Sequence, residues 1–308
     1  MPQALVKLAS PSSQARHGSA GMLYPGALIM CLAAMEPTMN REALTEIILS
    51  RLDDSVSTQW AVKAPGTDTR CAVIDDLLPA DVALQIFEAF PKDAEGFRTL
   101  KSFREHKRQA FDLSGFPPIL AEITYALQDK RVVDRVGQLT QISDLDGDPT
   151  LYAGGLSMMF PGQFLNPHVD NSHEASKSKY RRINTLYYVT PDWREENGGN
   201  LELWDEAVTT PHTIVSRFNR LVFMETSRRS WHSVSPVVAG APRCCVSNYY
   251  FSAQSPDVDD YYHVTSYNGR PEQGARRLWS KLDNAARQIA RQHLGMKRES
   301  DAGNSGVK

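Results

Sequence analysis

Apolar residues follow helical spacing through the first part of the chain. Residues 40–52 place apolar side chains along one helical face, and Asn40 is suited to cap that helix. Two further helices are predicted, one over residues 80–90 and one beginning at the Pro117-Pro118 pair. The apolar residues of these three helices are Leu44, Ile47, Ile48, Leu52, Val82, Leu84, Ile86, Phe87, Phe90, Ile119, Leu120, Ile123 and Leu127. We expect these helices to support a core.

The pattern changes to short β-type runs in the second part of the chain. From about Tyr152 to Ser252, apolar runs alternate with Pro, Gly and Asn, which is typical of a barrel or sandwich. An earlier short strand is predicted over residues 71–74. Residues 92–112 are polar and carry both charges, which favours a solvated loop and helix face, with the wall of a binding-site mouth as the alternative.

Two histidines and one aspartate are the candidate chemistry. His168 and Asp170 are two residues apart, so on a strand both side chains leave the same face and can hold one ion. His232 follows 64 residues after His168 and supplies a third ligand if the intervening strands fold back. Two imidazoles and one carboxylate form the ligand set of non-haem Fe(II) sites that keep open positions.

These residues resemble a known signature. His168-Val169-Asp170, His232 and Arg243 resemble the ligand and arginine pattern of the 2-oxoglutarate- and iron(II)-dependent dioxygenases, in their prolyl-4-hydroxylase-like branch. The resemblance covers roughly residues 73–252 and is strongest from Tyr152 onward. The segments that carry it beyond the ligands are 160–167, 182–189, 197–203 and 220–223.

The resemblance implies a mainly β fold with flanking helices, a double-stranded β-helix of the jelly-roll or cupin-like kind. It implies Fe(II) as the metal, 2-oxoglutarate as co-substrate and O2, with His168, Asp170 and His232 as catalytic metal ligands. Arg243 is the candidate for the distal carboxylate of 2-oxoglutarate, because a buried anion is costly and a guanidinium offers two parallel hydrogen bonds. Further candidates for co-substrate contacts are Ser247, Asn184 and Tyr188.

The implied activity is hydroxylation of an aliphatic C–H bond in a small, amino-acid-like molecule or biosynthetic intermediate, with release of succinate and CO2. Asp170 favours hydroxylation over halogenation, because related halogenases carry a small residue in its place. A peptidyl or carrier-tethered substrate, and a non-catalytic metal-binding β-helix, are the alternatives. Relatives often carry Tyr at the position of Phe160, so that hydroxyl is absent here, and Tyr152 is a candidate replacement.

A hydrophilic segment follows the first ligands. Residues 171–179 are expected to form a flexible loop, in which His173 is either a lid or substrate contact or a solvent-exposed residue. Arg181 and Arg182 lie where this loop returns to the barrel. Either can meet a substrate carboxylate, and a strand-edge solubility role is the competing interpretation.

Length and periodicity suggest three regions. We expect a flexible leader over residues 1–39, a single oxygenase domain over 40–268, and a C-terminal helix with a disordered tail over 269–308. Within the domain, residues 40–130 are the helical support and about 150–252 the β-helix core. The basic, amphipathic C-terminal helix is a candidate homodimer contact. The leader holds an apolar run of ten residues, too short to span a bilayer.

Charge and cysteine usage limit the partners. The chain has 308 residues and a formal net charge of −2, which gives no case for nucleic acid or membrane as the main partner. Its four cysteines form no Cys-x-x-Cys pair, so a reduced, cytoplasmic setting is the simpler interpretation.

Overall fold

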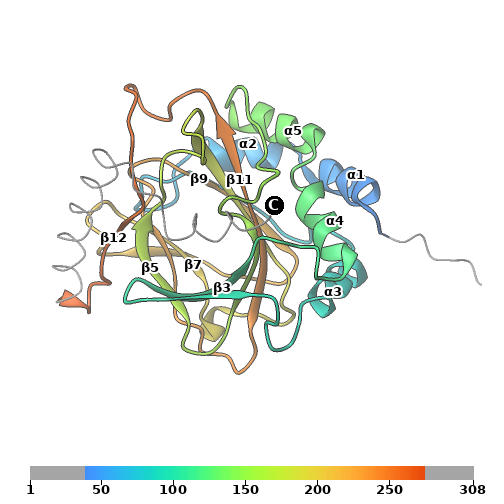
Figure 1. The fold of residues 1–308 in the computed structure, drawn as a ribbon. Helices are drawn as coiled ribbons and strands as arrows, with labels where there is room; N and C mark the ends of the chain where they lie inside the picture. Colours follow the sequence, from blue (N-terminus) through green and yellow to red (C-terminus); the bar gives the residue numbers. More distant parts are fainter. Residues whose placement is uncertain (1–38, 275–308) are drawn as a thin grey trace, which may run out of the picture. The chain divides into compact units, whose positions relative to one another are not determined.

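The computed structural model describes residues 39–274 (Figure 1). Five helices and one short 3-10 turn are present in this range: α1 Arg41–Arg51, α2 Asp54–Trp60, α3 Ala80–Glu88, α4 Pro118–Ala126, α5 Lys130–Thr140 and η1 Glu195–Asn197. The strands are β1 Cys71–Ile74, β2 Arg98–Lys101, β3 Glu105–Ala110, β4 Gly155–Met159, β5 Phe164–Val169, β6 Tyr180–Tyr188, β7 Leu201–Trp204, β8 Pro211–Ile214, β9 Arg220–Glu225, β10 His232–Val234, β11 Arg243–Ser252 and β12 Ser266–Tyr267. The predicted leader and most of the C-terminal segment lie outside the described residues.

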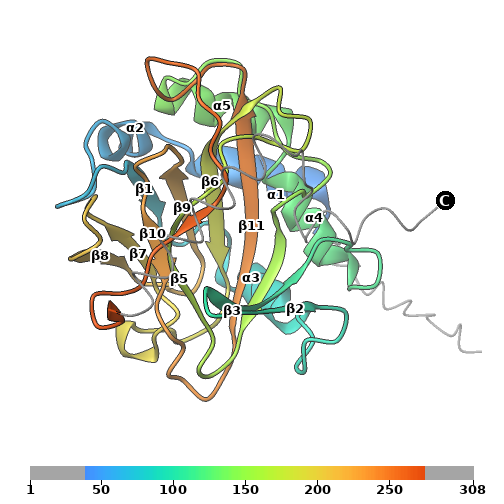
Figure 2. The same ribbon diagram turned by 60° about the vertical axis from the view of Figure 1, so that its left-hand side comes forward.

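The strands form the predicted double-stranded β-helix. Five strands, in the order β1-β9-β6-β11-β4, make one arm, and four strands, in the order β5-β10-β7-β8, make the other. All their pairings are antiparallel, and β3 joins the arms because its first residues, Glu105 and His106, pair with β5 and its last residues, Arg108 to Ala110, pair with β4. The two predicted sheets are therefore one continuous, curled sheet (Figure 2).

The three predicted helices are present, and two others were missed. Asn40 caps α1 by accepting a hydrogen bond from the Ala43 amide, and α4 begins after Pro117. Leu84 is an exception to the predicted apolar face, because it is 40% exposed. α2 is only seven residues long, whereas α5 is a full helix whose valines and Leu139 face the core.

The polar stretch at residues 92–112 is a correction. It forms the hairpin β2–β3 rather than a loop and helix face, and part of it lines a cavity, so the binding-site-wall alternative is the correct one. Its alternating polar residues look like a solvated surface in sequence. They face a cavity instead, because β3 is inserted between the two arms of the sheet.

Alternate residues of β6 and β11 face opposite ways. One set packs into a core shared with α1, α3, α4 and α5, as with Tyr187 and Tyr250. Tyr187 donates to the Asn219 side chain at 2.8 Å, and Tyr250 donates to the Leu127 carbonyl of α4. The other set, which includes Tyr188, faces the cavity between the arms. The period-two alternation of a strand thus separates structural from cavity-lining residues. Within the described residues, no helix is long and apolar enough to cross a membrane.

Candidate active site

Three potential metal ligands meet where β5 and β10 run side by side. His168 lies near the end of β5, Asp170 follows that strand, and His232 begins β10 opposite His168. The Nε2 atoms of His168 and His232 lie 3.6 Å and 3.8 Å from the carboxylate oxygens of Asp170. The three side chains are at most 10% exposed, and their donor atoms lie within 4.8 Å of one another. This spacing is compact enough for one ion.

The backbone fixes which nitrogen each imidazole presents. His168 Nδ1 lies 3.0 Å from the carbonyl oxygen of Asn166, and His232 Nδ1 lies 2.9 Å from that of Ser230. Because a carbonyl only accepts hydrogen bonds, each Nδ1 carries the proton. Each Nε2 therefore directs a lone pair towards Asp170, as a metal-binding histidine requires.

The surroundings hold the triad in metal-binding protonation states. Burial and the neighbouring His168 lower the pKa of His232 to about 3, so this imidazole is neutral at pH 7. Burial by itself raises the pKa of Asp170, but the Arg181 guanidinium and the two imidazoles hold it well below its usual value. Asp170 Oδ2 is buried and makes no hydrogen bond within the described residues. Two neutral imidazoles and an ionised carboxylate fit Fe(II).

A buried arginine lines the same cavity as the triad. Arg243 is 3% exposed, and its guanidinium forms no ion pair with a carboxylate in the described part of the chain. Its Nη2 contacts Met159 Sδ at 3.2 Å and the Ser157 hydroxyl at 3.5 Å. A buried cation held only by neutral groups is costly, so this arrangement favours a bound anion.

The other predicted co-substrate contacts line this cavity too. The Tyr188 hydroxyl is buried without a hydrogen-bond partner among the described residues, and the Arg243 guanidinium lies 5.3 Å from the Tyr188 ring. Ser247 and Asn184 are engaged by protein groups: the Ser247 hydroxyl donates to the Gly155 carbonyl at 3.3 Å, and the Asn184 amide lies 3.4 Å from the Tyr249 hydroxyl. The Tyr188 hydroxyl and the Asn184 side-chain oxygen are therefore buried polar atoms without a hydrogen-bond partner among the described residues, and only the hydroxyl can donate to an anion.

Phe160 lies outside the cavity lining. The Arg108 guanidinium stacks on its ring at 4.6 Å, so the side chain serves the packing of the β3–β4 side. Tyr152, the candidate replacement for the missing hydroxyl, does line the cavity.

Comparisons with known proteins agree with this geometry. Residues 154–251 match the model of the 2OG-Fe(II) oxygenase superfamily, a range that includes both histidines, Asp170 and Arg243. This stretch of the chain is therefore similar to the 2OG-Fe(II) oxygenase superfamily. Its relatives lie in the prolyl-4-hydroxylase-like branch, as the sequence predicted. The members of this superfamily use Fe(II), 2-oxoglutarate and O2, and the donor set described above fits this requirement.

Two curated relatives and one solved structure illustrate the similarity. Mouse prolyl 3-hydroxylase OGFOD1 is 28% identical over 133 residues, which are 40% of this chain and 23% of that protein. The hypoxia-inducible factor prolyl hydroxylase of Caenorhabditis elegans is 41% identical over 71 residues, 23% of this chain and 9% of that protein. The chain thus matches less than a quarter of the length of either relative. A prolyl 4-hydroxylase structure from Phytophthora capsici has a TM-score of 0.50 and 18% identity, covering 83% of this chain and 81% of that one.

Arg181 contacts the His168-Asp170-His232 triad directly. Its Nη1 lies 3.2 Å from Asp170 Oδ2, and its guanidinium stacks on the Tyr249 ring at 3.9 Å. Arg181 is 2% exposed, so the strand-edge solubility interpretation is wrong for this residue. Its Nε and Nη2 atoms have no hydrogen-bond partner within the described residues and belong to a cavity-lining side chain. Arg182 instead donates to the Gln254 carbonyl at 2.9 Å.

The loop after the triad is more enclosed than its sequence indicates. His173 is 8% exposed and packs on the rings of Tyr180 and Tyr262, at centroid distances of 4.2 Å and 5.8 Å. Its Nδ1 lies 2.7 Å from the Ser172 hydroxyl. The solvent-exposed interpretation of His173 is therefore wrong, and it lies outside the cavity lining.

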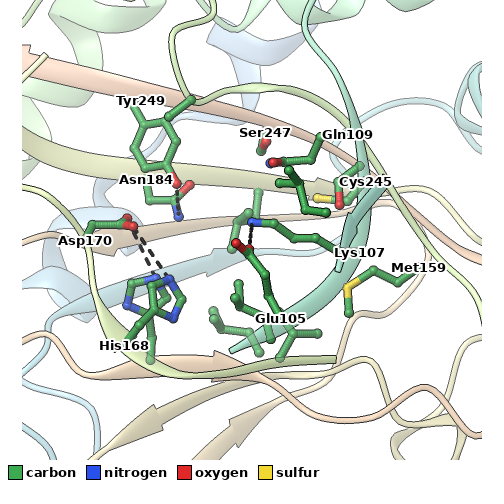
Figure 3. A pocket seen from close by; sticks show the side chains of 18 of the residues that line it. Glu105, Lys107, Gln109, Met159, His168, Asp170, Asn184, Cys245, Ser247 and Tyr249 are labelled. Atoms are coloured by element: carbon green, nitrogen blue, oxygen red, sulfur yellow. Dashed lines mark hydrogen bonds and ion pairs between the residues drawn. The ribbon is translucent and has the colours of Figure 1, made fainter. Parts of the chain in front are cut away.

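The sequence did not predict which residues form two parts of the cavity wall. The C-terminal strand β12 pairs with β5 and stacks Tyr267 on His168, with ring centroids 5.4 Å apart. The hairpin strand β3 directs Glu105, Lys107 and Gln109 into the cavity (Figure 3). The polar alternation of residues 105–109 was the available sequence signal.

Proposed function

We propose that this protein is a non-haem Fe(II)- and 2-oxoglutarate-dependent dioxygenase that hydroxylates an aliphatic C–H bond of a small molecule, releasing succinate and CO2. The single observation that supports this most is one cavity lined by both a His-Asp-His donor set and a buried arginine that has no counter-anion among residues 39–274. A metal-binding scaffold needs the first feature but has no use for the second.

The metal ligands and the co-substrate contacts have distinct roles in this proposal. Bound Fe(II), together with 2-oxoglutarate and O2, supplies the oxidising chemistry. His168 and His232 present Nε2 because backbone carbonyls hold the opposite nitrogen, and Asp170 supplies the anionic ligand. Arg243 and the Tyr188 hydroxyl bind the distal carboxylate of 2-oxoglutarate.

Arg181 is a positioning residue in the same proposal. Its guanidinium restrains the Asp170 carboxylate, and its Nε and Nη2 atoms, which have no hydrogen-bond partner among the described residues, belong to a side chain that lines the cavity. Those donors suit an acceptor oxygen of the substrate. The Tyr267 ring stacks on His168 and adds an aromatic side chain to the cavity wall.

The substrate class has two candidates. We favour a small amino-acid-like molecule or biosynthetic intermediate. A peptidyl substrate is the second candidate, because relatives of the matched segment are named as prolyl hydroxylases. We also retain as proposals a single oxygenase domain over residues 40–268, a cytoplasmic location and dimerisation through the C-terminal helix.

Succinate formation from 2-oxoglutarate in air tests the proposed activity. We expect Fe(II)-dependent succinate release by the wild-type protein and a loss of at least about a hundredfold in Asp170→Ala, because one metal ligand is gone. Asp54→Ala is the matched control, since the Asp54 side chain is 97% exposed on α2. Folded, iron-loaded protein that forms no more succinate than Asp170→Ala would contradict the proposal.

A further inference from the structure

Strand β3 has an unusual inner face. Its alternate residues Glu105, Lys107 and Gln109 all line the cavity, followed by Phe111 just after the strand (Figure 3). β3 is an interior strand, paired with β4, β5 and the hairpin partner β2. The inner face of an interior strand is normally apolar, so three consecutive polar positions require a reason.

Glu105 and Lys107 form an ion pair within this row. Lys107 Nζ lies 3.1 Å from Glu105 Oε2, and the two side chains are only 16% and 17% exposed. Withdrawing two charges this far from water costs free energy that one pairing seldom recovers.

The pair lies close to the metal triad. Glu105 is opposite Leu165 on β5, the strand that carries His168. The Tyr267 hydroxyl lies 3.5 Å from Glu105 Oε1, and the Tyr267 ring stacks on His168. One aromatic side chain therefore connects Glu105 to a metal ligand, and the ion pair lines the same cavity as the triad.

We propose that Glu105 and Lys107 recognise the substrate, and that the substrate is a small zwitterion of the α-amino-acid type. Its ammonium group pairs with Glu105 and its carboxylate with Lys107. This inference rests on the proposed oxygenase function and specifies its substrate class. The ammonium nitrogen and carboxylate oxygens of an amino acid are about 3 Å apart by covalent geometry, similar to the separation of the two side-chain charges.

Exchange of partners explains why both charges are present. In the empty cavity the two side chains pair with each other, and a zwitterion offers each of them a charged partner of its own. An internal residue of a peptide has neither charge. Its entry would bury the ion pair further from water without giving either group a new partner, which is unfavourable.

Binding of matched acids and amides tests this inference. The probes are the free amino acids and their carboxamides, added anaerobically to protein loaded with Fe(II) and 2-oxoglutarate and followed by calorimetry. We expect at least one acid to bind about tenfold or more tightly than its amide, because the amide lacks the anionic partner of Lys107. In Lys107→Met this preference should disappear, and in Glu105→Gln the preference for a free over an N-acetylated amino group should disappear.

The control variant is Lys101→Met, because Lys101 is an exposed lysine on β2 outside the cavity lining. It should keep the acid preference. The inference is overturned if no acid in the panel outbinds its amide, if a proline-containing peptide binds best, or if Lys107→Met mainly raises the 2-oxoglutarate concentration needed for binding. Failure of Fe(II) and 2-oxoglutarate to bind the wild-type protein would instead contradict the proposed function.

Discussion

Two adjacent tyrosines of β6 show how single residues divide between stability and function. Tyr187 points to the helical side, where its hydroxyl donates to Asn219, and Tyr188 lines the cavity with a hydroxyl that has no hydrogen-bond partner in the described part of the chain. Both phenols have pKa values raised by burial, so both hydroxyls stay protonated and act as donors at neutral pH. Only Tyr188 is placed to donate to an anion beside Arg243.

Removing each hydroxyl separates these roles. Tyr188→Phe should raise the 2-oxoglutarate concentration for half-saturation by about three- to tenfold, because one hydrogen bond to the carboxylate is lost. Tyr187→Phe should leave that concentration unchanged but lower the free energy of unfolding by about 1 kcal/mol. Titration of 2-oxoglutarate and urea unfolding measure the two effects. Equal behaviour of the two variants in the titration would refute the assignment.

At the scale of elements, a buried ion pair holds strand β12 next to β5, the strand that carries His168. Arg270, which follows β12, contacts both carboxylate oxygens of Glu202 on β7, at 3.2 Å and 2.6 Å. The Ser233 hydroxyl, beside His232, also donates to Glu202, and both charged side chains are at most 10% exposed. The pair therefore holds β12, and with it Tyr267, against His168.

Breaking this pair on one side should be costly. Arg270→Met is expected to lower the free energy of unfolding by about 3–5 kcal/mol, because Glu202 remains buried and unpaired. The double variant Arg270→Met/Glu202→Met should lose less than Arg270→Met alone. Lys130→Met is the control, since Lys130 and Asp134 are 70% and 48% exposed and water screens their pair, so its loss should change stability very little. If Arg270→Met lowers the free energy of unfolding no more than Lys130→Met does, the Arg270–Glu202 pair does not hold β12 in place.

The sequence predicted local features better than distant pairings. The two-residue spacing of His168 and Asp170 and the Asn40 cap are local patterns, and the structure has both. The hairpin strand β3 was missed because its polar inner face looks like a solvated surface until the cavity beside it is known. Tyr267 and Arg270 were missed because their partners lie far away in sequence, on β5 and β7.

At the scale of the whole molecule, the curled sheet brings the metal-binding residues and the proposed co-substrate-binding residues into one cavity. The arm containing β5 and β10 supplies the His-Asp-His donor set, and the arm containing β6 and β11 supplies Arg243 and Tyr188. β3 closes the gap between the arms and adds a charged pair to the wall. Metal and co-substrate binding should therefore depend on residues that no single segment of the chain contains.

Anaerobic binding of Fe(II) and 2-oxoglutarate is the most direct test of the proposed metal and co-substrate site. Binding is monitored by the weak visible charge-transfer absorption of the complex that they form. The wild-type protein should develop the band, and Arg243→Ala should need at least about tenfold more 2-oxoglutarate, because a charge-assisted pair is lost. Arg217→Ala, which alters a 56% exposed arginine, should titrate like the wild type. A folded, iron-loaded wild-type protein without the band, or an Arg243→Ala variant that titrates like the wild type, would contradict the account.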